Sequence, residues 1–90
     1  MAEKTYEEAI AAYLSIALQD ADYGGFIESI GHIARAHGIS SVAQSTGLGR
    51  ESLYKALARG SKPRFETVCR VIASLGLRLV VMPAVPRGER

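Results

Sequence analysis

The chain has no tryptophan and only one cysteine among its 90 residues. Because a disulfide needs two cysteines, none can form within the chain. A single cysteine fits a reducing compartment such as the cytoplasm. No apolar run approaches the roughly 18 residues that a membrane-spanning helix needs. The N-terminal stretch MAEKTYEEAI also lacks the apolar core of a signal peptide. These absences predict a cytoplasmic protein with no membrane partner.

The residue patterns of enzymes and metal sites are scarce as well. The chain has no Ser-His-Asp order in a motif context, no phosphate-binding glycine loop and no metal-ligand cluster. His32 and His37 have no further ligands at metal spacing, so we expect packing or surface roles for them. Cys69 lies in a helical apolar pattern and is predicted to be a small buried hydrophobe. The sequence therefore predicts no catalytic residue, no metal and no cofactor.

The net charge of the chain is small, but its positive and negative residues are unevenly distributed along the sequence. The net charge is +2; residues 1–49 hold two Lys/Arg and six Asp/Glu (−4), and residues 50–90 hold nine Lys/Arg and three Asp/Glu (+6). We therefore expect any polyanion to bind the second half. The alternative is a basic face that is simply solvated.

Three stretches have the apolar spacing of amphipathic helices. The first covers residues 5–20, where Thr5 and Glu8 are spaced as a capping box. After a break at residues 20–25, the second covers residues 26–37 and ends at Gly38. The last begins near Phe65 and ends at Gly76. The expected core positions are Tyr6, Ile10, Tyr13, Leu14, Ala17, Leu18, Phe26, Ile30, Ile33, Ala34, His37, Phe65, Val68, Cys69, Ile72 and Leu75.

Between them, ISSVAQSTGLGRESLYKALARG (residues 39–60) has the spacing of a helix-turn-helix, the motif that lays its second helix in the DNA major groove. Ser40 or Ser41 is expected to cap a first helix that starts near Val42, with Ala43 small at the crossing point. Gly47 suits a turn residue with positive φ, and Leu48 is expected to pack beneath it. Gly49 is a weak N-cap for the second helix. Leu53, Ala56 and Leu57 then face inward, and an ordinary αα-hairpin remains the alternative.

The outer face of this motif carries the expected DNA contacts. Arg50, Tyr54 and Lys55 are predicted to read bases, with Glu51 able to accept from a cytosine amino group. Ser41, Arg59, Lys62 and Arg64 are predicted to contact phosphates from the flanks. The full predicted DNA-binding set is Ser41, Gln44, Gly49, Arg50, Glu51, Ser52, Tyr54, Lys55, Arg59, Lys62 and Arg64.

The stretch LRLVVM (Leu77, Arg78, Leu79, Val80, Val81, Met82) is rich in β-branched residues and ends at Pro83. It predicts a short β-strand. A lone strand needs a partner for its backbone groups, so we expect antiparallel pairing with a second copy in a homodimer, or addition to the sheet of another protein. We expect one domain over residues 1–83 and no regular structure in residues 84–90.

The order of these segments resembles a known family. TGLGRESLYKAL, the Pro-Arg-Phe after the basic loop, and LGLRLVV are similar to the addiction-module antidote proteins, small Xre-type helix-turn-helix antitoxins akin to the HigA group. The resemblance covers about residues 10–83. One departure is Gly49, where the family often has Ser; the change weakens the cap and removes a hydroxyl that could contact phosphate.

The resemblance implies an all-α, five-helix Xre (lambda-repressor-like) domain with a short C-terminal strand. It also implies a bacterial antitoxin that neutralises a RelE/HigB-like toxin and represses its own operon at a palindromic double-stranded DNA operator. The acidic half would suit a basic toxin, although a solvated helix face explains it equally well. Two other functions stay open: a stand-alone phage-type repressor, and a helical protein-interaction module without DNA binding.

Overall fold

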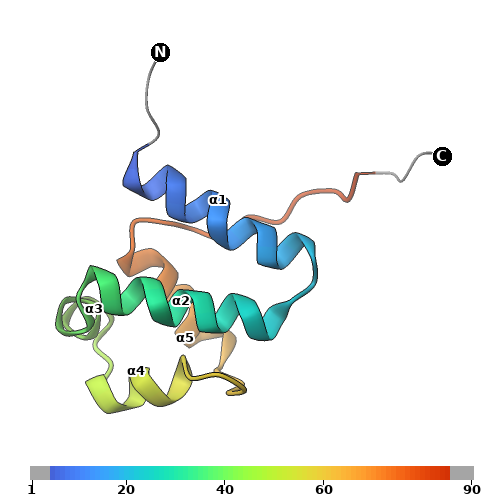
Figure 1. Cartoon of the computed structure of the whole chain (residues 1–90). Coiled ribbons are helices and arrows are strands. Elements are labelled where there is room, and N and C mark those ends of the chain that lie inside the picture. Colours follow the sequence, from blue (N-terminus) through green and yellow to red (C-terminus); the bar gives the residue numbers. More distant parts are fainter. Residues whose placement is uncertain (1–4, 86–90) are drawn as a thin grey trace.

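A computed structural model describes residues 5–85 of the chain. It has five helices within that range (Figure 1): α1 (Tyr6–Gln19), α2 (Tyr23–His37), α3 (Ile39–Thr46), α4 (Arg50–Ala56) and α5 (Phe65–Ser74). α1 packs on α2, both α2 and α3 pack on α5, and α4 packs on α3. In Figure 1, α4 therefore lies on the far side of α2 from α1. The all-helical prediction is confirmed for these residues.

Local caps explain where the first two helices begin. The amide of Glu8 donates to Thr5 Oγ1 at 3.1 Å and the amide of Thr5 donates to Glu8 Oε1 at 3.0 Å, so the predicted capping box is present. The prediction that the second helix starts at Phe26 is wrong, because Asp22 caps a helix that starts at Tyr23. The Asp22 carboxylate accepts from the amide of Gly25 at 3.0 Å. A Cβ at Gly25 would overlap that carboxylate, so the glycines predicted to break the chain instead fit the first turn.

The core lies between α2, α5 and the inner faces of the other helices. Its centre is formed by fully buried Ile30, Val42, Leu53 and Val71. Most predicted core positions are confirmed, but several are wrong: Tyr6, Tyr13, Leu18, His37 and Phe65 are exposed. α1 packs on the body along a narrow line at Ile10 and Leu14, which leaves the two edges of its apolar stripe in solvent.

The start of α3 also differs from the prediction. The helix begins at Ile39 with Gly38 as its N-cap, and neither Ser40 nor Ser41 caps it. Gly38, with φ 119°, is both the C-cap of α2 and the N-cap of α3. The amide of Val42 donates to the Gly38 carbonyl at 3.0 Å, which closes the first turn three residues earlier than expected. Both serines therefore lie inside the helix with exposed side chains.

The predicted β-strand at residues 77–82 is wrong. No strand occurs within residues 5–85; after α5 the chain turns at Gly76, and the amide of Leu77 donates to the Ile72 carbonyl at 3.1 Å. Beyond Leu77 the segment runs past α1 and projects from the body (Figure 1). The physical reason is that the helices offer no edge with which an extended segment could form a ladder. Ala84 and Val85 have no regular structure either, and the rest of the predicted tail, residues 86–90, lies outside the described residues, as does Glu3 of the acidic half.

Candidate nucleic-acid interface

The turn between α3 and α4 has the geometry that its glycines predicted. Gly47 is left-handed, with φ 76° and ψ 10°, and its amide donates to the Ala43 carbonyl at 2.9 Å. The hydroxyl of Thr46 donates to the Val42 carbonyl at 2.8 Å and accepts from the amide of Leu48 at 3.2 Å. These bonds join the end of α3 to the start of the next element, so the turn is held from both sides. Gly47 is confirmed as the positive-φ residue of the turn.

Gly49 is the N-cap of α4, as predicted. Its backbone is extended, with φ −71° and ψ 151°, and no side chain caps the helix. The amide of Leu53 donates to the Gly49 carbonyl at 3.0 Å. Because a side-chain cap contributes about 1 kcal/mol to a typical helix, α4 must be held mainly by its packing.

That packing is supplied by the inner face of α4 and by α2. Leu53 and Leu57 are buried and Ala56 packs against the same core, as predicted. Gly31 of α2 lies so close to the end of α4 that a Cβ there would be 2.8 Å from the Leu57 carbonyl oxygen. A glycine at this position therefore lets the α2 backbone and the end of α4 approach closely.

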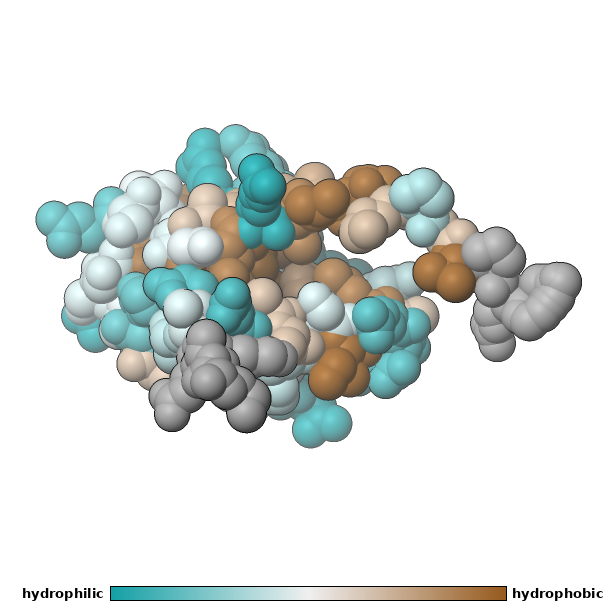
Figure 2. Space-filling model, turned by 90° about the horizontal axis from the view of Figure 1, so that it is seen from above, coloured by the Kyte–Doolittle hydropathy of each residue, from teal (hydrophilic) through white to brown (hydrophobic). Residues whose placement is uncertain are grey.

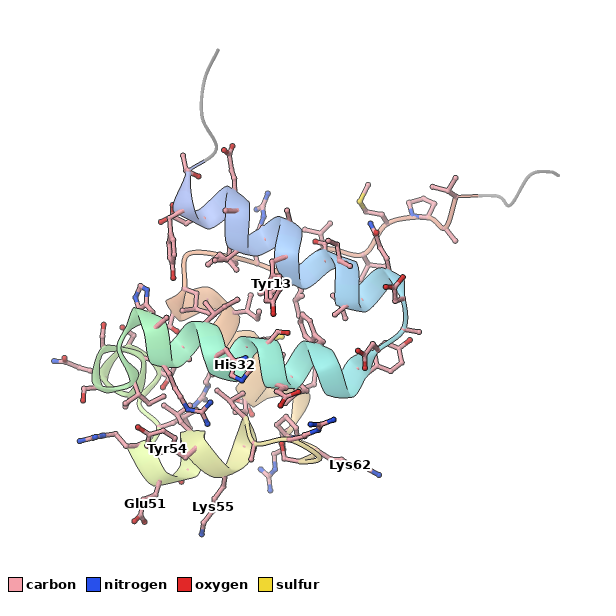
Figure 3. The ribbon with its side chains drawn as sticks, viewed as in Figure 1. Tyr13, His32, Glu51, Tyr54, Lys55 and Lys62 are labelled. Atoms are coloured by element: carbon pink, nitrogen blue, oxygen red, sulfur yellow. The ribbon has the colours of Figure 1, made fainter. Side chains whose placement is uncertain are left out.

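The predicted base-reading residues, and Ser52 of the predicted DNA-binding set, are all on the solvent-exposed part of α4. Arg50, Glu51, Ser52, Tyr54 and Lys55 are all exposed. In Figure 3 the side chains of Glu51 and Lys55 point away from the body. This face combines two cations, one carboxylate and an aromatic hydroxyl on one short helix.

The predicted phosphate-contacting residues flank that helix. On one flank Ser41 is exposed on α3, and Gln44, which belongs to the predicted DNA-binding set without an assigned phosphate contact, is exposed on the same helix. On the other flank Arg59, Lys62 and Arg64 are exposed in the loop that follows α4. The loop is tied back to α4, since the Ser61 hydroxyl donates to the Ala56 carbonyl and the Ser61 amide donates to the Ala58 carbonyl. The cations of the loop are thus carried on a backbone fixed to the end of α4.

Arg35 is a residue of this surface that the sequence reasoning missed. Its guanidinium carbon lies 5.5 Å from the centre of the Tyr54 ring, a cation–π contact between α2 and α4. The available signal was Gly31, because a glycine inside a helical pattern marks close backbone approach and Arg35 lies one turn further on the same face. The exposed cations on and around α4, called here the cationic surface, therefore include one residue from the acidic half of the chain, Arg35.

The predicted packing and surface residues can be located as well. His32 and His37 are exposed, and Cys69 is half-buried. Within residues 5–85, no three His, Cys, Asp or Glu side chains gather in a way that could hold a metal ion. No helix in the same range is long and apolar enough to cross a bilayer.

Residues 5–85 form a small all-helical domain. On one side it exposes α4, called here the cationic helix because it carries Arg50 and Lys55, together with the residues that flank it. Residues 2–83 match the model of a family described as "Probable addiction module antidote protein", and the chain belongs to that family. A protein of Haemophilus influenzae (strain ATCC 51907 / DSM 11121 / KW20 / Rd), described as uncharacterized, is 40% identical over 77 residues, which are 86% of this chain and 79% of the relative. No solved structure matches the chain.

Membership of an antidote family has two direct consequences. It points to a regulatory protein rather than an enzyme, and it implies a toxin as a partner. The resemblance seen in the sequence is thereby confirmed at the level of the antidote family.

Proposed function

We propose that this chain is the antitoxin of a toxin–antitoxin module, that it binds double-stranded operator DNA through α4, and that it represses its own operon in the bacterial cytoplasm. The observation that carries the DNA-binding part is the α3–turn–α4 unit. Its inner side is fixed to the core through Leu53 and Leu57, and its outer side presents Arg50, Tyr54 and Lys55 to solvent. A rigid helix with long polar side chains on one face is what major-groove reading requires.

The charges around α4 support the same proposal. Arg59, Lys62 and Arg64 follow α4 on a loop tied back to the end of that helix, and Arg35 lies beside it on α2. Side chains of this kind at the edges of a reading helix contact phosphates, while those in the centre contact bases. The single carboxylate of the face, on Glu51, can accept a hydrogen bond from a cytosine amino group.

The operator is expected to be palindromic. A single α4 can contact only one short half-site, so two copies are needed for a specific operator, with half-sites about 34 Å apart. The partner toxin is proposed to be of the RelE/HigB type, on the resemblance of TGLGRESLYKAL and LGLRLVV to HigA-like antitoxins.

The test is a binding titration with a labelled duplex from the region upstream of the gene for this chain. A scrambled duplex of equal composition is the control, and both are measured over a series of salt concentrations. Tight binding to the first duplex with a steep negative slope of log affinity against log salt is expected. Equal binding to both duplexes would refute sequence-specific reading, and the absence of salt-dependent binding to either would leave a protein-interaction module as the remaining function. Specific DNA binding by a chain that never binds a toxin would indicate a stand-alone repressor.

A further inference from the structure

An apolar groove lies on the side of the molecule away from α4, between α1 and the segment after α5. Its walls include Ala11, Leu14 and Leu18 of α1 and, across from them, Ile72, Leu77 and Leu79. In Figure 2, apolar side chains run along the projecting segment and line the hollow between it and the body. The groove therefore opens toward solvent with an apolar floor.

Exposed apolar side chains continue from the groove over the surface beside it. Leu18, Phe26 and Leu79 line both the groove and a second hollow, where Phe65 is 72% exposed. Further along the segment, Val81 is 99% exposed and Met82 is 76% exposed. A continuous apolar surface of this kind on a small domain marks an interaction site rather than ordinary surface composition.

The charges around the groove are mainly acidic. Residues 5–34 hold five carboxylates and no Lys or Arg. Two of these, Glu7 and Glu8, line the groove, where Arg78 is the one cation among its lining residues. A partner that fits must therefore present an apolar segment accompanied by Lys or Arg.

We infer that this groove is the docking site for a basic segment of the toxin, an inference that rests on the proposed antitoxin function. Nucleic acid is a poor occupant, since its phosphates would meet the α1 carboxylates. A second copy related by a two-fold axis at the groove would bring the same carboxylates together, which is unfavourable for an isologous contact. A toxin segment that carries Lys or Arg beside apolar side chains would complement both Glu7 and Glu8 and the apolar walls of the groove.

The position of the groove has a consequence for regulation. α2 separates α1 from α4, and the groove and the cationic helix lie on different sides of the molecule (Figure 1). A toxin segment in the groove would leave Arg50, Tyr54 and Lys55 uncovered. The toxin-bound antitoxin is therefore expected to bind operator DNA as well as the free antitoxin does.

The test titrates the full chain with its cognate toxin, meaning the purified protein encoded beside it. Ser15 is exposed and lines the groove, so Ser15→Arg obstructs it and adds a positive charge without touching the core. We expect Ser15→Arg to weaken toxin binding at least about 30-fold, the size of effect seen at the centre of an interface, and Glu7→Lys to weaken it about 10-fold. Affinity for operator DNA should be unchanged in both variants.

Ser45→Arg is the matched control, because it makes the same change at an exposed position of α3. Equal toxin affinity of Ser15→Arg and wild type, or equal losses in Ser15→Arg and Ser45→Arg, would overturn the docking inference. A wild-type chain that does not bind the toxin at all would instead refute the proposed antitoxin function. Light scattering of the free chain completes the design: a mass that falls from dimer to monomer in Ser15→Arg would assign the groove to a second copy and overturn the inference.

Discussion

The cationic helix α4 and the apolar groove beside α1 differ in how their exposed side chains are supported. α4 stands on buried Leu53 and Leu57, is joined to α3 through Thr46 and Gly47, and approaches the α2 backbone at Gly31. Residues 78–85, by contrast, form no ladder hydrogen bonds and leave most of their apolar side chains in solvent.

The comparison suggests different ways of binding. A pre-organised polar face loses little conformational entropy when it meets a regular duplex, which suits sequence reading. An apolar segment without internal contacts gains most of its order from the partner that covers it.

The largest effect is expected at Gly31. Gly31→Ala would place a Cβ 2.8 Å from the Leu57 carbonyl oxygen, so either α2 or α4 must move. We expect the free energy of unfolding to fall by roughly 1–3 kcal/mol, the usual cost of overpacking. Urea denaturation followed by circular dichroism measures it.

The matched control is Gly24→Ala in the first turn of the same helix, where a Cβ meets nothing within 4 Å. It should leave stability unchanged or raise it by up to about 1 kcal/mol, because alanine is the better helix former. Val81→Asp on the projecting segment, where the side chain is fully exposed, should also cost little. Equal losses in Gly31→Ala and Gly24→Ala would show that the close approach of α2 and α4 does not support the cationic helix.

Arg50 tests what the exposed face of α4 does. Arg50→Ala is expected to reduce the affinity for operator DNA by roughly 1–3 kcal/mol and to relax the preference at one base pair. Stability should change little, because Arg50 is exposed. Anisotropy titrations with the operator and with variants at each base pair make the measurement. A uniform loss on operator and random DNA would refute base reading by Arg50, and a loss of toxin binding would contradict the separation of the two surfaces.

The comparison between sequence and structure shows which kinds of feature a sequence can predict. The turn at Gly47, the cap at Gly49 and the inward Leu53 and Leu57 were predictable because each depends on a local backbone preference or a helical period. The capping box at Thr5 is of the same kind. The exposure of the candidate site residues of α4 was predictable for the same reason.

The features that were missed depend on contacts between distant segments. The cap at Asp22 needs Gly25 to be without a side chain, a requirement that appears only when the carboxylate position is known. The contact between Arg35 and Tyr54, two residues 19 positions apart in the sequence, joins α2 to α4. The strand prediction failed for a related reason: β-branched residues favour an extended segment, but a strand also needs a neighbour, and residues 5–85 provide none.

Lys62 tests the flank of the cationic surface. Lys62→Ala should weaken binding to all duplexes alike and reduce the slope of log affinity against log salt by about 0.9, the value for one phosphate contact. Its side chain is exposed on a loop whose backbone Ser61 ties to α4. Glu66→Ala on α5 is a control of opposite charge that should not reduce the slope. If the slope of Lys62→Ala equals that of the wild type, Lys62 does not contact a phosphate.

The smallest effect is expected for the pair of Arg35 and Tyr54. A guanidinium over an exposed aromatic ring contributes about 0.5–1 kcal/mol, so the pair should hold α2 and α4 together more weakly than the packing at Gly31. A double-mutant cycle with Arg35→Ala, Tyr54→Leu and both changes together isolates this energy from the loss of each side chain.

The same cycle distinguishes two roles for Arg35. Tyr54→Phe keeps the ring and should preserve the coupling in urea denaturation, whereas Tyr54→Leu should abolish it. If Arg35 only positions Tyr54, its loss should lower operator affinity in wild type and have no further effect in Tyr54→Leu. If it contacts DNA itself, Arg35→Ala should reduce the salt slope in both backgrounds. Additive stability effects throughout the cycle would mean that the 5.5 Å approach contributes nothing measurable to the attachment of α4.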